Sequence, residues 1–281
     1  MTDDLLAFAQ DLVRIKSFSG QEEEAAKLIA SKMKALQFDK VKIDRYGNVL
    51  GRVGEGERSL LFDSHTDVVN VTDEDRWEVP PFSGEIIEGF LWGRGSVDMK
   101  SATAASIYAA AIAKNQGLLS GKTVFVSCTV DEETCDGVGL KHLLEECHIR
   151  PDYGVICEPS ANTISIGHKG KAQVVIKTYG VSAHGSTPEL GRNAIYEMAE
   201  IIQRVEQTNN EYLPRNGKKS SLVMSQISST SVSLNAIPSE CQAYLDRRMI
   251  LGETEQTIRD EMDSIIAGKN ATWEIGTLHR T

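Results

Sequence analysis

Hydrophobic and polar positions follow two different periods along the first 160 residues. Apolar residues recur with helical spacing over 3–15, 22–36, 99–116 and 138–147, and the second of these stretches opens with acids suited to a helix N-terminus. Short apolar runs at 59–62, 122–130 and 153–157 indicate buried strands, and residues 40–53 predict a β-hairpin. Strands that alternate with crossover helices predict an α/β sheet covered on both faces.

The pattern changes after a glycine-flanked stretch at 167–170, which reads as a hinge. The later part predicts a strand, a helix, two strands, a helix and a strand, at 171–180, 192–207, 222–233, 239–250, 254–267 and 271–278. This β-α-β-β-α-β order is that of a ferredoxin-like α+β domain. We therefore expect two domains, at 1–170 and 171–281.

Composition narrows the classes of protein that the chain can represent. Of the 281 residues, 41% are hydrophobic and 25% charged, which is typical of a soluble globular protein. The formal net charge of −10 argues against nucleic acid or an anionic membrane surface as a partner, and no apolar run approaches the ~18 residues of a membrane helix. The acidic, amphipathic N-terminus does not resemble a signal peptide, and the five cysteines are scattered without a C-x-x-C pair. We expect a cytoplasmic protein with reduced thiols.

Acidic residues and one histidine collect where predicted strands end or where the following helix begins. They are His65 and Asp67 after 59–62, Asp98 before the helix at 99–116, Glu132 and Glu133 after 122–130, and Glu158 after 153–157. Ligands of α/β sheets bind at the carboxyl ends of the strands. One imidazole with several carboxylates is a ligand set for zinc, manganese or cobalt.

Each of these residues also has a simpler explanation. The His65–Asp67 pair could belong to a solvated loop, Asp98 could cap its helix, the two glutamates could be an exposed pair, and Glu158 could belong to a turn. Because four segments of one domain carry ligand-type residues, we favour a metal site. A phosphate-binding loop at "GRGSVDMKS" is rejected, since Met99 stands where that motif requires glycine.

Several longer motifs resemble one family of enzymes. They are "SHTDVV", "RWEVPPFSGEIIEGFLWGRGSVDMKS", "DEETCDG", "ICEPS", "GVSAHGSTPELGRNAI" and "NAIPSECQAYLDRRMILGET", which cover nearly the whole chain. On these motifs the sequence resembles the M20 metallopeptidases and deacylases, a group that includes carboxypeptidase G2, aminoacylase, succinyl-diaminopimelate desuccinylase and acetylornithine deacetylase. Among them it looks most like a subgroup of selenium-metabolism-linked hydrolases. The resemblance implies a zinc-peptidase-like α/β catalytic domain with an inserted ferredoxin-like lid domain.

The resemblance also implies roles for the residues of the catalytic domain. His65, Asp98 and Glu158 would hold one ion, and Asp98 would bridge to a second ion held by Glu133. Zn²⁺ is the expected metal, with two ions in a complete site, and Co²⁺ or Mn²⁺ as alternatives. Asp67 would orient the imidazole of His65, and Glu132 would act as general base toward a metal-activated water. We expect the two adjacent glutamates to differ in role because neighbouring side chains on an extended backbone point opposite ways.

Three lid residues complete the site that the resemblance implies. His184 matches a histidine that stabilises the developing oxyanion and that, in dimeric relatives, reaches the site of the other subunit. Asn235 and Arg248 match a pair that binds the carboxylate of the substrate, with Arg247 as the adjacent competitor for Arg248. A homodimer through the lid domain is therefore expected.

Family members usually continue about 100 residues beyond the point that corresponds to Thr281, and that part carries the last ligand of the second metal. On this ground the chain looks C-terminally truncated, and we do not expect His279 to replace the ligand. We expect such a chain to bind its second metal weakly, to have little activity and to expose apolar surface and an unpaired sheet edge.

The leading hypothesis is a metal-dependent hydrolase that cleaves an amide or peptide bond in a small carboxylate-bearing substrate, such as a dipeptide or an N-acyl amino acid. The alternative is a non-catalytic relative that acts as a dimerisation or ligand-binding module. A third hypothesis is a mononuclear hydrolase that uses only the first metal site.

Overall fold

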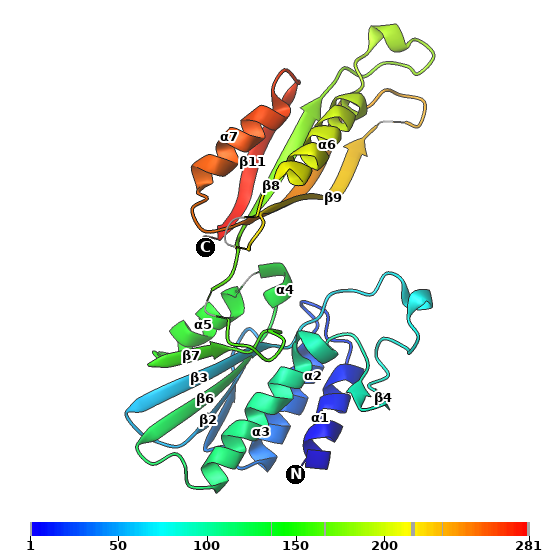
Figure 1. Ribbon diagram of the computed structural model, residues 1–281. Coiled ribbons are helices and arrows are strands. Elements are labelled where there is room, and N and C mark those ends of the chain that lie inside the picture. The colour runs from blue at the N-terminus through cyan, green and yellow to red at the C-terminus, as the bar shows by residue number, and fades with distance from the viewer. Residues whose placement is uncertain (1, 136, 166, 215–216, 232, 280–281) are drawn as a thin grey trace. The chain divides into compact units, whose positions relative to one another are not determined.

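The computed structural model describes residues 2–279 except 136, 166, 215–216 and 232. The chain divides into two compact units, unit 1 at Met1–Thr163 and unit 2 at Ile164–Thr281 (Figure 1). The division precedes the 170/171 boundary that the sequence suggested. The helices in the described residues are all too short or too polar to cross a membrane.

Unit 1 is built on a five-stranded mixed sheet with the order β1-β2-β6-β3-β7. Its strands are β1 (Lys40–Ile43), β2 (Val49–Val53), β3 (Arg58–His65), β6 (Lys122–Thr129) and β7 (Tyr153–Ile156). β1 and β2 form the antiparallel hairpin predicted from the sequence, whereas β3 runs parallel to both β6 and β7. The carboxyl ends of these three parallel strands therefore share one edge of the sheet.

Three helices cover one face of this sheet. They are α1 (Thr2–Arg14), α2 (Glu23–Ala35) and α3 (Ser101–Asn115) (Figure 1). They share a core with the inward side chains of β2 and β6. At Gly51 of β2, an added Cβ would lie 2.6 Å from Met33 Sδ and Phe38 Cδ1, so glycine permits the close approach of α2.

The opposite face is covered only in part by the described elements. α5 (Val138–Cys147) contacts β6. A pocket of about 730 Å³ opens over β1, β2 and β6 and is lined by Lys42, Arg52 and Phe125 among others. The expectation of a sheet covered on both faces is thus met in full on one face and in part on the other.

Three local features differ from the sequence prediction. β3 extends to His65, so this residue ends the strand rather than following it. Glu132 and Glu133 lie in a short helix, α4 (Glu132–Cys135), and the extended backbone expected for them was wrong. β4 (Ile86–Ile87) and β5 (Phe90–Leu91) form a small hairpin whose turn residues, Glu88 and Gly89, both have positive φ. Short η segments lie at Glu74–Arg76, Ser96–Lys100 and Pro188–Leu190.

Unit 2 is a ferredoxin-like α+β domain, as the sequence predicted. Its elements are β8 (Gly170–Tyr179), α6 (Ala194–Glu211), β9 (Ser221–Thr230), β10 (Glu240–Met249), α7 (Glu255–Ile266) and β11 (Ala271–His279). The four strands form an antiparallel sheet in the order β11-β8-β10-β9. Both helices pack on one face, where Met198 and Ile258 meet Val174, Ile176 and Leu245.

Candidate metal centre

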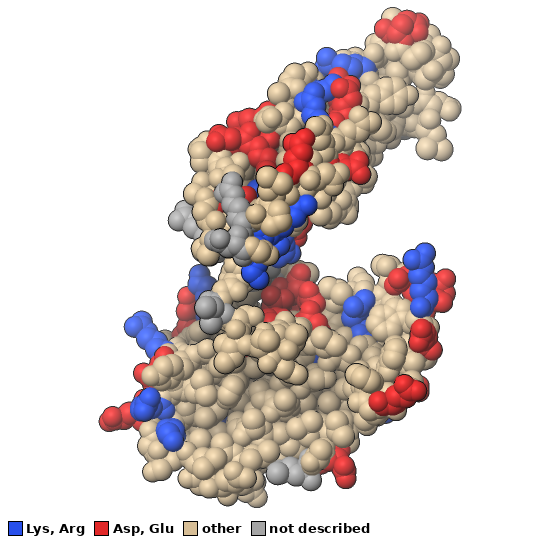
Figure 2. Space-filling model, viewed as in Figure 1, with Lys and Arg blue, Asp and Glu red and all other residues tan. Residues whose placement is uncertain are grey.

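The ionisable residues singled out in unit 1 converge at the edge where the parallel strands end. His65 is the last residue of β3, α4 follows β6, and Glu158 follows β7. Asp98 lies in the η segment before α3, at a point where the backbone is not helical and the Asp98–Met99 peptide bond is cis. In the space-filling view, a group of carboxylates gathers at this end of unit 1 (Figure 2).

The imidazole of His65 faces carboxylates with one ring nitrogen and the main chain with the other. Nδ1 lies 3.0 Å from the main-chain oxygen of Asp67 and 3.5 Å from its Oδ1. A carbonyl oxygen can only accept, so this contact places a proton on Nδ1 and leaves a lone pair on Nε2 in the neutral ring. Nε2 lies 3.1 Å from Asp98 Oδ1, 3.7 Å from Glu158 Oε1 and 4.0 Å from Glu132 Oε2.

The donor set fits a divalent ion. One ligand atom from each of His65, Asp98 and Glu158 lies within 4.8 Å of the others, and among the described residues this is the group that meets that condition. Two atoms that each lie roughly 2.0–2.2 Å from one zinc ion can be at most about 4.4 Å apart. The distances from His65 Nε2 to Asp98 Oδ1 and to Glu158 Oε1 are both below this limit. Glu133 is not in this group.

The charges at this edge are out of balance. Burial alone would lower the pKa of His65, but the carboxylates of Asp67 and Asp98 outweigh it and raise that pKa to about 11. Burial raises the pKa of Glu158 to about 7, with further contributions from Asp98 and the two glutamates of α4. The hydrogen bond with His65 lowers the pKa of Asp98, whereas burial and then the charge of Asp98 raise the pKa of Glu133. A cation would relieve this repulsion, and protons would compete with it.

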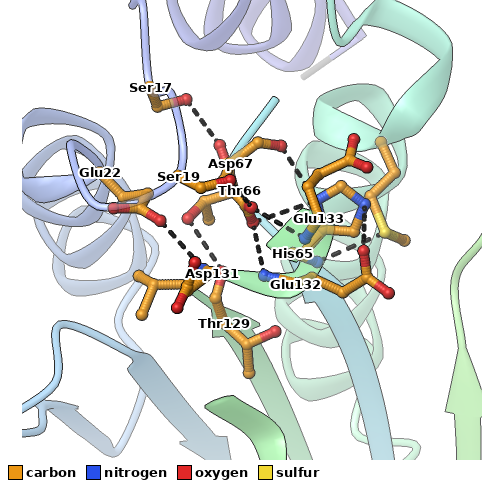
Figure 3. Close-up of polar contacts among 12 residues, drawn as sticks. Ser17, Ser19, Glu22, His65, Thr66, Asp67, Thr129, Asp131, Glu132 and Glu133 are labelled. Atoms are coloured by element: carbon orange, nitrogen blue, oxygen red, sulfur yellow. Dashed lines mark hydrogen bonds and ion pairs between the residues drawn. The ribbon is translucent and has the colours of Figure 1, made fainter. Parts of the chain in front are cut away.

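Asp67 supports more than the imidazole. Its side chain is fully buried, and it accepts hydrogen bonds from Ser19 Oγ at 2.7 Å and from the main-chain N–H groups of Glu132 and Glu133 at 3.1 and 3.0 Å (Figure 3). Burial would raise its pKa, but these donors and His65 hold the pKa at about 2. Asp67 therefore links His65 to the start of α4.

Other residues around the site were not identified from the sequence. Ser17 Oγ donates to the main-chain oxygen of Thr66 at 2.6 Å, and the buried carboxylate of Glu22 accepts the main-chain N–H of Asp131 at 2.9 Å (Figure 3). Lys100, also buried, donates from Nζ to the main-chain oxygens of Leu12 and Ile15 near the end of α1. Burial lowers the pKa of Lys100 to about 8. No local sequence signal marks these contacts, because each partner is distant along the chain.

Two of the three lid candidates lie side by side in unit 2. The main chain pairs across two loops, with Gly185 N donating to Asn235 O at 2.7 Å and Ile237 N donating to Ala183 O at 2.8 Å. His184 and Asn235 are both exposed there. Nδ1 of His184 accepts the N–H of Ser186 at 3.2 Å, which directs the ring proton of the neutral imidazole to Nε2.

The alternation along β10 separates the two adjacent arginines. Arg247 is 1% exposed and points into the core of unit 2, whereas Arg248 lies on the outer face and pairs with Asp246 at 2.7 and 2.9 Å. Arg248 stands opposite Lys171, near the end of β10, while Asn235 precedes the start of that strand. At about 3.3 Å per residue, the part of β10 from Glu240 to Arg248 alone is roughly 26 Å long. Within a single lid the length of β10 thus separates Asn235 from Arg248, and their pairing on one substrate carboxylate stays a prediction.

Comparison with known proteins agrees with this architecture. Residues 166–274 match the model of the peptidase dimerisation domain. The chain is 35% identical over 273 residues to the uncharacterized protein YgeY of Escherichia coli, covering 95% of this chain and 67% of that protein. It is 32% identical over 260 residues to a succinyl-diaminopimelate desuccinylase of Cereibacter sphaeroides, covering 88% and 68%. The chain thus spans about two thirds of the length of these relatives.

Solved structures share the fold at low sequence identity. The M20 family metallo-carboxypeptidase Sso-CP2 of Sulfolobus solfataricus superimposes with a TM-score of 0.70 at 16% identity, over 99% of this chain and 79% of that one. YXEP of Bacillus subtilis, described as a dinuclear metal binding peptidase, gives a TM-score of 0.63 at 16% identity, over 99% and 73%. From the curated relatives and the fold together, the chain belongs to the M20 family of metallopeptidases and amidohydrolases.

Proposed function

We propose that this protein hydrolyses an amide or peptide bond in a small carboxylate-bearing substrate, a dipeptide or an N-acyl amino acid, at a metal centre built on His65. The observation that carries the proposal is the orientation of the buried imidazole. Its Nδ1 is engaged by a carbonyl oxygen, and its Nε2 faces three carboxylates that share an excess of negative charge. An imidazole nitrogen and several carboxylates with excess negative charge are ligands for a divalent cation.

In this proposal His65, Asp98 and Glu158 hold one ion. Asp98 and Glu133 would hold a second ion, which is supported by the effect of the Asp98 charge on Glu133 and by the description of the structural neighbour YXEP as dinuclear. Zinc is the proposed metal, with cobalt and manganese as alternatives of the same ligand preference. When bound, the ions supply Lewis acidity toward the amide carbonyl and the attacking water.

The residues of the chain then divide the remaining work. Glu132 is the proposed general base, which takes a proton from the attacking water and delivers it to the leaving nitrogen. Its Oε2 lies 4.0 Å from Nε2 of His65, and Asp67 fixes its main chain. Adjacent residues of a helical turn project about 100° apart, so Glu132 and Glu133 can still serve different roles on α4.

The lid is proposed to supply oxyanion and carboxylate binding in a homodimer. His184 presents an Nε2–H donor, and Asn235 lies beside it. Since Arg248 is at the far end of β10, we propose that one lid serves two sites, with Arg248 used by its own subunit and His184 with Asn235 used by the partner. The match to a peptidase dimerisation domain supports this arrangement.

The test is hydrolysis of a panel of dipeptides and N-acetyl amino acids by the metal-free chain and by the chain supplied with Zn²⁺, Co²⁺ or Mn²⁺. Metal-dependent turnover should fall at least ~100-fold in Glu132→Gln. Glu145→Gln, on the exposed side of α5, is the matched control and should leave turnover unchanged. Absence of turnover with every metal and substrate, with binding retained, would replace this proposal by a ligand-binding module. One ion per chain at full turnover would favour a mononuclear site.

A further inference from the structure

Three consecutive main-chain N–H groups at the end of β6 are bound by two buried carboxylates. Asp131 N donates to Glu22 Oε1 at 2.9 Å, and the next two N–H groups, of Glu132 and Glu133, donate to Asp67 (Figure 3). Glu22 is 5% exposed and Asp67 is fully buried. The segment that carries the proposed base and a proposed ligand is thus held at three successive positions by side chains from other parts of unit 1.

The local backbone explains why these acceptors are needed. β6 ends at Thr129, Asp131 adopts a left-handed conformation with φ of 59°, and α4 is only four residues long. The first N–H groups of a helix have no partner inside it, and a buried N–H without an acceptor is costly. The positive φ of Asp131 is itself unfavourable for a residue with a Cβ, so this bend persists only where its surroundings hold it.

Glu22 is free to serve this segment because it does not serve its own helix. It occupies the N-cap position of α2, yet its side chain makes no capping hydrogen bond there. Its main chain still accepts the N–H of Ala26 at 2.9 Å, which continues the helix normally. The neighbouring acids Glu23 and Glu24 are exposed, as expected for acids at a helix N-terminus. Burial and a distant partner distinguish Glu22 from both.

We propose that Glu22 is a positioning residue for the catalytic segment: by accepting the N–H of Asp131 it fixes where α4 begins, and hence where the carboxylates of Glu132 and Glu133 stand relative to His65. This inference rests on the proposed function for its catalytic consequence, but its structural part does not. Glu22 acts through the main chain and does not touch the reacting atoms.

The first test measures hydrogen–deuterium exchange of the Asp131 amide by NMR in the metal-free chain. In the wild type this amide should be protected. Glu22→Met, which keeps much of the volume and removes the acceptor, should accelerate its exchange about tenfold, the value of one lost hydrogen bond. Glu22→Gln retains an acceptor oxygen and should restore protection, and the exposed control Glu24→Met should leave exchange unchanged.

The second test measures the functional consequence in the same variants. Glu22→Met should weaken Co²⁺ binding by about tenfold, in the range found when a residue that orients a metal ligand is lost, and should lower kcat with KM unchanged. Glu22→Gln should recover both. If the wild type shows no turnover, the exchange data still decide the structural part.

Three results would overturn the proposal. They are an unprotected Asp131 amide in the wild type, equal exchange in Glu22→Met and the wild type, and a Glu22→Gln variant that behaves like Glu22→Met. The first needs no variant, so the proposal stays testable if Glu22→Met does not fold.

Discussion

Each unit buries a basic residue among carboxylates, and the two groups differ in how their charge is compensated. In unit 2 the buried base is Arg247, and in unit 1 it is His65, which is 2% exposed. A charge removed from water must be paired and hydrogen-bonded, or some other ion must compensate it. The two groups therefore show how a structural cluster of charges can be distinguished from one that requires a ligand.

The group in unit 2 is complete in itself. Arg247 forms a two-point contact with Glu253 at 3.0 and 3.2 Å and donates from Nε to Glu261 at 2.8 Å. Glu253 also accepts from Ser220 Oγ and from Ile250 N, both at 2.8 Å, and Glu261 accepts from the hydroxyl of Tyr212. Every carboxylate here has donors from the protein, so the cluster joins β10 to α7 and the loops beside them.

The group in unit 1 lacks this balance. Five carboxylates, those of Asp67, Asp98, Glu132, Glu133 and Glu158, surround a single imidazole. Asp67 is satisfied by protein donors, whereas the raised pKa values of Glu133 and Glu158 show carboxylates that the protein leaves under-compensated. A divalent cation would supply the missing charge, so acids around a buried base indicate stability in unit 2 and a binding site in unit 1.

The largest expected effect is the loss of the structural cluster. Arg247→Ala leaves two largely buried carboxylates without their partner and should reduce the free energy of unfolding by about 3–5 kcal/mol. Arg248→Ala, at an exposed pair, should change it by less than about 1 kcal/mol. Urea unfolding of the full chain measures both. Equal effects of the two variants would contradict the distinction between buried and exposed arginines.

The second effect concerns metal affinity. His65→Ala removes the single nitrogen ligand and should weaken Zn²⁺ binding by more than about 100-fold. Loss of a residue that only hydrogen-bonds to a ligand typically weakens metal binding by about 10–100-fold. His142→Ala is a matched control, because His142 stacks on Tyr46 at 4.5 Å on another part of unit 1. Competition with a zinc-binding dye gives both dissociation constants. Undiminished binding in His65→Ala would place the ion elsewhere.

Proton release on metal binding should depend on pH. With a pKa of about 11, His65 carries its extra proton at both pH 8 and pH 6, and with a pKa of about 7, Glu158 is mostly charged at pH 8 and mostly protonated at pH 6. Zn²⁺ binding should therefore release about one proton at pH 8 and approach two at pH 6. Calorimetry in buffers of different ionisation enthalpy counts them. Release that is absent, or that falls as the pH is lowered, would disagree with the charge imbalance.

The smallest effect is the acid sensitivity that Asp67 confers on the metal-free chain. Its folded pKa of about 2 is below the unfolded value, so its stabilising contribution is present above about pH 4 and disappears as the pH falls toward 2. Asp67→Asn should remove this pH-dependent contribution to the free energy of unfolding, which is on the order of 1 kcal/mol once solvent screening is allowed for. Thermal unfolding between pH 2 and pH 5 tests it, and parallel profiles for the variant and the wild type would argue against the assignment.

Most of the elements could be predicted because their sequence signals are local. The hairpin at β1–β2, the helices α1, α2, α3 and α5 and the six elements of unit 2 each have their own periodicity, whereas the four-residue α4 does not. The residues that meet at the sheet edge follow from where the parallel strands end. The strands β4 and β5 escaped prediction because each has only two residues.

The supporting residues could not be predicted from one sequence. In the sequence Glu22 does not differ from other acids at the start of a helix, and its hydrogen-bond partner Asp131 is 109 positions away. The separation of Asn235 from Arg248 follows from the length of β10, and a match to a family motif does not give that length. Tertiary contacts, rather than local propensity, decide both cases.

The most direct test of the central claim is X-ray absorption at the zinc edge of the chain loaded with one equivalent of Zn²⁺. The account predicts one imidazole nitrogen and carboxylate oxygens at roughly 2.0–2.2 Å, with the imidazole scattering lost in His65→Ala. A sulfur ligand at about 2.3 Å, from Cys157 beside Glu158 for example, or histidine scattering that persists in the variant, would contradict it.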